Sequence, residues 1–146
     1  MTLKNLLEIG QLVEHETNAD QVAKMLSSAE RSFHDAHQTS ISLETRFDAA
    51  YRTIMQLAML GLWMNGYRPP KNRPGHHVTM IQSLPKTIGL DNANMLILDT
   101  FRIKRNAADY TGEEIDEASV EACITSADNL RKHIIAWLSE YRQDLM

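Results

Sequence analysis

A stripe of polar side chains recurs at helical spacing near the end of one predicted helix. On a helix of 3.6 residues per turn, residues at i, i+3, i+4 and i+7 share one side. The members of this polar stripe are Arg102, Arg105, Asn106, Asp109 and, beside them, Tyr110. Two guanidinium groups and an amide suit a phosphodiester, because arginine pairs with phosphate oxygens through two parallel hydrogen bonds. The stripe therefore predicts a phosphate-binding site.

The same polar stripe has a plainer interpretation, a solvated helix face on which an arginine and an aspartate form a local ion pair. Apolar residues border the stripe on both edges, Phe101 and Ala108 on one and Ile103 and Ala107 on the other. Such borders are typical of a stripe that faces a cleft. Periodicity alone favours the solvated helix face over the phosphate site.

The elements that must position the stripe are helices. Apolar periodicity and capping residues predict helices over residues 2–17, 18–36, 42–66, 78–84, 91–110 and 120–141, with Pro85 kinking or ending the fourth. No run alternates with period two for long enough to predict a strand. The predicted fold class is all-α, a helical bundle, and residues 1–146 are expected to form a single domain because this length is typical of one core.

One clear loop, GYRPPKNRPG over residues 66–75, precedes the stripe helix, since its prolines and glycines break both helix and strand patterns. It carries Arg68, Lys71 and Arg73 without an acidic residue, and His76 and His77 follow directly. Adjacent histidines lack the i, i+4 spacing of a helical zinc pair. We therefore expect no metal site and no cofactor.

The predicted helix over residues 42–66 is apolar on nearly every side, which places it in the centre of a bundle or at a subunit contact. Tyr51 lies on its apolar stripe and is expected to pack, with its hydroxyl bonded at the helix edge. Cys123 is expected to be a small core residue. Because one bundle of this length would leave part of the apolar surface uncovered, we predict a homodimer.

Composition excludes some classes of function. A formal net charge of −4 argues against a protein that coats nucleic acid through a broad cationic face. A single cysteine permits no intramolecular disulfide, so the cytoplasm is the expected location. Charged residues interrupt the apolar positions near the N-terminus, so we expect neither a signal peptide nor a membrane span.

The stretch FRIKRNAADYTG resembles the variable motif of HEPN-domain proteins, in which an arginine precedes a histidine by several residues and a tyrosine often follows. The order of segments over residues 42–141 is also similar: a central helix with AAYRTIMQLA, the GYRPPKNRPGHH loop, the arginine helix and a long terminal helix. The resemblance implies a helical bundle, commonly dimeric, in which the motif helices of two subunits line a shared cleft.

The resemblance also implies a reaction. Many HEPN members are metal-independent ribonucleases, in which the arginine stabilises phosphate charge while the histidine moves a proton as the ribose hydroxyl attacks its own phosphate. Other members bind nucleotides or act beside a nucleotidyltransferase. By this resemblance, Arg102, Arg105, Asn106 and Tyr110 are the candidate site residues.

This chain departs from the HEPN pattern at the histidine. If Arg105 is the motif arginine, Tyr110 stands where the histidine would be. If Arg102 is the motif arginine, Ala108 takes that place and Tyr110 matches the tyrosine beyond it. A tyrosine with a pKa near ~10 is a poor base at neutral pH. His77 or its neighbour in the loop would supply an imidazole only if the loop folds over the stripe, and histidines at such positions more often cap or pack at a helix start.

Three functions remain open. The first is binding of RNA or a nucleotide phosphate through the polar stripe, with cleavage by a divergent endoribonuclease. The second is a non-catalytic dimeric partner of another protein, an antitoxin or a nucleotidyltransferase. The third makes Tyr110 the acceptor of a nucleotidyl group from a partner enzyme. The three differ in the effect expected from loss of Tyr110.

Overall fold

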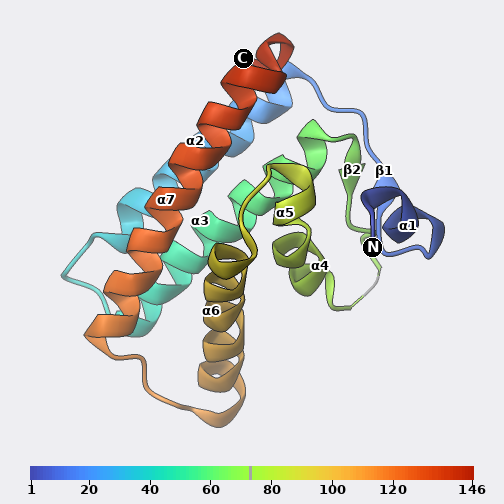
Figure 1. Cartoon of the computed structure of the whole chain (residues 1–146). Helices are drawn as coiled ribbons and strands as arrows, with labels where there is room; N and C mark the ends of the chain where they lie inside the picture. Colours follow the sequence, from blue (N-terminus) through green and yellow to red (C-terminus); the bar gives the residue numbers. More distant parts are fainter. Residues whose placement is uncertain (73) are drawn as a thin grey trace.

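Helices dominate the structure, a computed structural model that describes residues 1–72 and 74–146 (Figure 1). The helices are α1 Leu3–Glu8, α2 Ala19–Ala36, α3 Leu43–Met64, α4 His76–Gln82, α5 Leu84–Thr87, α6 Asn92–Thr111, α7 Glu117–Tyr141 and the 3-10 turn η1 Gln143–Leu145. Two short strands, β1 Val13–Glu14 and β2 Tyr67–Arg68, pair antiparallel. The expected all-α class is confirmed, and the expectation of no strand is wrong at this short ladder. Arg73 of the predicted loop lies outside the described residues.

Helix α3 forms the centre of the core, and α2 and α7 pack along it (Figure 1). The Ser42 hydroxyl caps its first turn by accepting a hydrogen bond from the Thr45 backbone N–H, 3.1 Å away. Nearly every turn of α3 buries an apolar side chain. The central position expected for this helix is confirmed. Because its apolar sides are covered within one chain, α3 no longer supplies a reason for dimerisation.

The N-terminal helix is shorter than predicted. It was expected to reach about residue 17, but α1 ends at Glu8, and Gly10 follows with a left-handed φ of 76°. The chain then turns so that Val13 pairs with Arg68 of the loop. Extended pairing supplies backbone hydrogen bonds to both segments, and α1 itself contains no fully buried residue. Local helical periodicity was therefore overridden by a tertiary contact.

The helix that carries the polar stripe begins and ends as predicted. The Asp91 carboxylate accepts a hydrogen bond from the Asn94 backbone N–H, 2.7 Å away, and Gly112 closes α6 with a φ of 72°. Helix α6 lies beside α4 and buries only Leu98 and Phe101 fully. Its opposite face is open to solvent. In the described part of the chain, no helix combines the length and the hydropathy needed to cross a bilayer.

Candidate phosphate site

Arg105 of α6 points toward α3. Its guanidinium lies over the ring of Tyr51, with 5.2 Å between Cζ and the ring centroid, which is a cation–π contact. Its Nε donates to Asp48 Oδ1 at 3.4 Å and lies 3.9 Å from Asp109 Oδ2. These contacts are long, and the side chain is 34% exposed. The Nη groups donate no hydrogen bond to any described residue, so Arg105 retains the fork that binds phosphate.

Arg102 is held more tightly. Its Nε donates to Asp99 Oδ1 at 2.7 Å and its Nη2 donates to Asp99 Oδ2 at 3.2 Å, a bidentate pair one turn apart on α6. The Arg102 side chain is 19% exposed. The hydrogen bond to Asp99 raises the pKa of Arg102, mainly by stabilising its charged form. Arg102 therefore supplies fixed positive charge, whereas Arg105 can reach a ligand.

His77 lies beside the same tyrosine. The Tyr51 hydroxyl and His77 Nδ1 are 3.1 Å apart, which is hydrogen-bond distance. Burial lowers the pKa of His77, and the positive charges of His76, Arg105 and Arg102 lower it further. Imidazole at this position is consequently neutral at neutral pH.

Tyr51 is buried, and burial raises the pKa of its hydroxyl to about 12, although Arg105 and Arg102 oppose the shift. The hydroxyl therefore keeps its proton. If Tyr51 donates to Nδ1, His77 presents Nε2–H, a donor for a phosphate oxygen. If Nδ1–H donates to Tyr51, Nε2 presents a lone pair that can accept a proton. The two tautomers suit ligand binding and proton transfer respectively.

The short helix α4 fixes His77 near α6. It starts after Gly75, which has a left-handed φ of 80°, and it is anchored by Met80 and Ile81, both buried in the core. His77 precedes these residues by one helical turn, so it shares their inward face. The expected packing role of Tyr51 is confirmed by its burial, and its hydroxyl bonds to this histidine.

The structure separates the residues of the polar stripe. Arg102 and Arg105 face α3 and α4, whereas Asn106 and Tyr110 are exposed, Tyr110 at 85%. Because Tyr110 follows Arg105 by five residues, their side chains point about 140° apart around the helix axis. Tyr110 is therefore remote from the imidazole at Tyr51.

The two carboxylates that hold the arginines, Asp99 and Asp48, lie outside the polar stripe. Asp99 precedes Arg102 by three residues, a spacing that predicts an ion pair on a helix. Asp48 is brought to Arg105 only by the packing of α6 on α3, so the sequence contains no local signal for it. Arg102 thus forms a local arginine–aspartate pair on the helix, with Asp99 as its partner and with only 19% of its side chain exposed.

Other candidate residues take structural positions. Cys123 is buried, as expected, and burial raises the pKa of its thiol to about 12. Within the described ranges, no group of three or more histidine, cysteine, aspartate or glutamate side chains converges as metal ligands would. The site is thus built from guanidinium, imidazole, phenol and carboxylate groups.

Comparison with family models, with curated proteins and with solved structures found no match for this chain.

Proposed function

We propose that this chain is a HEPN-like helical domain that binds RNA or a nucleotide phosphate between Arg105 and His77. The observation that supports it most directly is the meeting of both groups at one phenol. Arg105 stacks on the Tyr51 ring, and His77 bonds to the Tyr51 hydroxyl. An arginine and a neutral imidazole beside each other are the groups that phosphate recognition and proton transfer require.

A phosphate would bind by replacing a weak partner of Arg105. The contact with Asp48 is long and half-exposed, and ion pairs of this kind contribute at most about 1 kcal/mol. A phosphate oxygen can therefore displace the carboxylate at little cost and gain a bidentate contact. Arg102 stays with Asp99 and adds positive potential without touching the ligand.

The reaction proposed for bound RNA needs no metal. His77 Nε2 accepts the proton of a ribose 2′-hydroxyl as that oxygen attacks the adjacent phosphorus. The new P–O2′ bond forms, the P–O5′ bond breaks, and the proton passes from Nε2 to the leaving 5′-oxygen. The products are a 2′,3′-cyclic phosphate and a free 5′-hydroxyl. Arg105 stabilises the charge on the phosphoryl oxygens during the transfer.

Cleavage of a fluorescent RNA in excess chelator tests this proposal. His77→Gln is expected to lower the cleavage rate by about 10²-fold or more, because a general base contributes this much, and to change RNA affinity little. Arg105→Ala is expected to weaken RNA binding about tenfold. His34→Gln, an exposed histidine on α2, is the matched control.

Residual RNA cleavage by a double Arg102→Ala, Arg105→Ala variant reports any contaminating nuclease. Binding and cleavage that are the same in Arg105→Ala, in His77→Gln and in the native protein would defeat the proposal. RNA binding that requires Arg105, with no RNA cleavage, would support a phosphate-binding domain and contradict the nuclease activity.

A second candidate function, a dimeric partner protein, is favoured by the outer face of α6. This face repeats with the 4-3 spacing of a coiled-coil seam. Its residues are Ala93, Leu96, Thr100, Ile103, Ala107 and Tyr110. Leu96 is 59% exposed and Ile103 is 56% exposed, which is unusual for large apolar side chains on one continuous stripe.

The sizes along this outer face alternate in a way that suits a second copy of α6. Small residues alternate with large ones, so an antiparallel pair opposes each large side chain to a small one. The layers are Ala93 with the partner's Tyr110, Leu96 with the partner's Ala107, and Thr100 with the partner's Ile103. In the same register Lys104 flanks the partner's Ile97, so no like charges meet.

Such a dimer would serve as the non-catalytic partner of an antitoxin or a nucleotidyltransferase protein. The third role considered, Tyr110 as acceptor of a nucleotidyl group, is supported by the exposure of its phenol. The antiparallel pair would cover Tyr110, so nucleotidylation and dimerisation through α6 exclude each other. Mass spectrometry of Tyr110 in the monomer and the dimer distinguishes them, since the modified peptide should occur only in monomer.

A further inference from the structure

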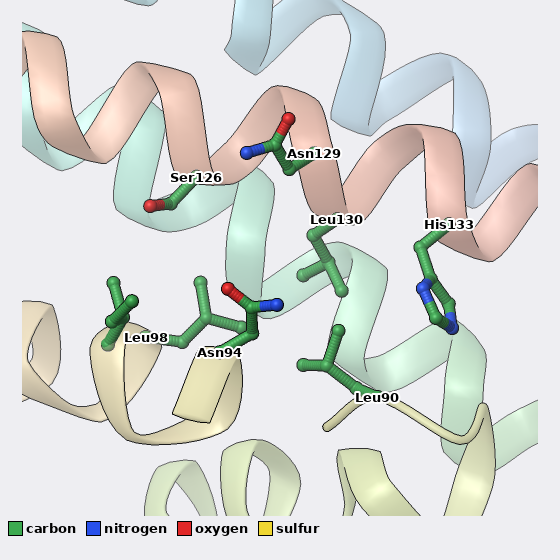
Figure 2. Close-up of a pocket in the computed structure, with 8 residues that line it drawn as sticks. Leu90, Asn94, Leu98, Ser126, Asn129, Leu130 and His133 are labelled. Carbon is green, nitrogen blue, oxygen red and sulfur yellow. The ribbon is translucent and has the colours of Figure 1, made fainter. Parts of the chain in front are cut away.

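A cavity of about 160 Å³ opens between α6 and α7 (Figure 2). Leu98 from α6, Leu130 from α7 and Leu90 from the preceding loop form its apolar floor. All three leucines are buried, each at most 7% exposed. Two helices and a loop therefore hold the walls in fixed positions.

Polar groups gather at the rim of this cavity. Ser126, Asn129 and His133 lie on one face of α7, and Asn94 approaches from α6 (Figure 2). The Ser126 and Asn129 side chains form no hydrogen bond with any described residue. None of the residues that line the cavity is an aspartate, glutamate, lysine or arginine.

His133 is oriented by the main chain. Its Nε2 lies 2.7 Å from the carbonyl oxygen of Ile88 and donates to it. In the neutral imidazole Nδ1 then carries the lone pair, and the ring presents an acceptor on the side of the cavity (Figure 2). Together, the rim offers a hydroxyl, two carboxamides and an acceptor nitrogen whose hydrogen-bonding capacity is not fully used.

We infer that this cavity binds a neutral nucleobase. A planar heterocycle has apolar faces for the leucine floor and an edge of donors and acceptors for the rim. A cavity of about 150 Å³ holds a benzene-sized molecule, so the volume of about 160 Å³ suits a planar ring of that order of size. Identification of the heterocycle as a nucleobase rests on the proposed function, whereas the cavity and its chemistry do not.

The uncharged lining separates this base site from the phosphate site. The lining of the cavity has no lysine or arginine that could pair with a phosphate or a carboxylate. A sugar would leave hydroxyls unpaired against the three leucines. One RNA chain can therefore place a base between α6 and α7 and a phosphate at Arg105, which follows Leu98 by seven residues on the same side of α6, about 10 Å along the helix.

Methyl NMR of the full chain with adenosine and uridine tests the base site, because neither nucleoside carries a phosphate. Saturable shifts are expected at the methyl groups of Leu90, Leu98 and Leu130, with a dissociation constant of about 1 mM or tighter for at least one nucleoside. Asn129→Leu removes a polar rim group at an exposed position and should weaken binding about tenfold. Thr125→Leu, also exposed on α7 but outside the cavity, is the matched control and should bind normally.

The outcomes separate this inference from the proposed function. Nucleoside binding that persists in Arg105→Ala supports the base site, even if RNA binding proves independent of Arg105 and the proposed function fails. The inference is overturned if neither nucleoside shifts the signals of the three leucines. It is also overturned if toluene binds as tightly as the nucleosides and its affinity is unchanged in Asn129→Leu. Loss of nucleoside binding in Arg105→Ala also overturns it, because the base would then sit at the arginines.

Discussion

The two faces of α6 differ in almost every physical property. The inner face contributes Leu98 and Phe101 to the core and holds Arg102 and Arg105 against carboxylates and an aromatic ring. The outer face is apolar and uncovered, and it ends at the exposed Tyr110. A helix that only completed the core would have a charged outer face. This contrast is the basis of our proposal that α6 serves a chemical site on one side and a binding surface on the other.

Position along the chain does not show which residues of α6 lie together in space. Along the chain the arginines and Tyr110 are neighbours, but the helix directs them to opposite surroundings. In the proposed site the imidazole belongs to His77 of α4, which bonds to the buried phenol of Tyr51 on α3. The proposed chemistry thus depends on three helices, and the outer face is free for a partner.

The largest effect is expected from a charge placed on the outer face of α6. Ile103→Asp puts a charge at the centre of the proposed α6 pair and should raise the dimer dissociation constant by about 100-fold or more. Light scattering should report twice 16.6 kDa for the native protein and a monomer for the variant at the same concentration. Ile135→Asp, an exposed isoleucine on α7, is the matched control. A native monomer at micromolar concentration, or a dimer that tolerates Ile103→Asp, would contradict this role of the face.

The next largest effect is on the free energy of unfolding, which should differ between variants of the two inner arginines. Arg102→Ala leaves the half-buried Asp99 without its bidentate partner and should lower the free energy of unfolding by about 2 kcal/mol. Arg105→Ala breaks longer, more exposed contacts and should cost about 0.5 kcal/mol. Urea denaturation measures both. Equal losses would show that the structure does not divide the arginines into a positioned charge and a ligand-binding group.

Much of the fold follows from the sequence. Caps at Ser42, Asp91 and Gly112 and the apolar periodicity between them predict α3 and α6 correctly, because these signals are local. The end of α1 does not follow, since residues after Gly10 pair with a distant loop. A contact of this kind leaves no trace in the periodicity of either segment.

The candidate site could be predicted only in part. The arginines were identified from their spacing, and the partner of Arg102 lies one turn away on the same helix. The link from Arg105 to Tyr51 and from Tyr51 to His77 joins three helices, and no spacing in the sequence encodes it. Tyr51 was correctly expected to be buried, but its hydroxyl partner depends on where α4 packs.

A third prediction compares two positions for an added histidine. Ala108 lies one helical turn after Arg105 and faces the core, whereas Tyr110 points away. We expect weak native RNA cleavage and a gain of about tenfold in Ala108→His, because a second imidazole beside Arg105 can act as the acid. Tyr110→His should show no gain. Cleavage assays in chelator decide this, and a gain in Tyr110→His alone would place the phosphate on the outer face.

The smallest expected effect is on stability at mildly acidic pH. The pKa of His77 is lower in the folded chain than the value of 6.5 expected when unfolded. Below pH 6.5 the unfolded chain therefore binds a proton that the folded chain does not, so the free energy of unfolding falls as the pH falls through this window. Denaturation between pH 5 and 8 should show a shallower dependence in His77→Gln. An unchanged dependence would mean that His77 is not buried as described.

Nitrogen NMR of the His77 imidazole during titration with a 3′-nucleoside monophosphate tests the central claim most directly. The account predicts a saturable shift at Nε2 in the native protein, its loss in Arg105→Ala and its retention in Tyr110→Phe. It also predicts that the bound phosphate raises the pKa of His77, because a nearby anion favours imidazolium. A His77 signal that ignores the nucleotide, or that responds equally without Arg105, would contradict the account.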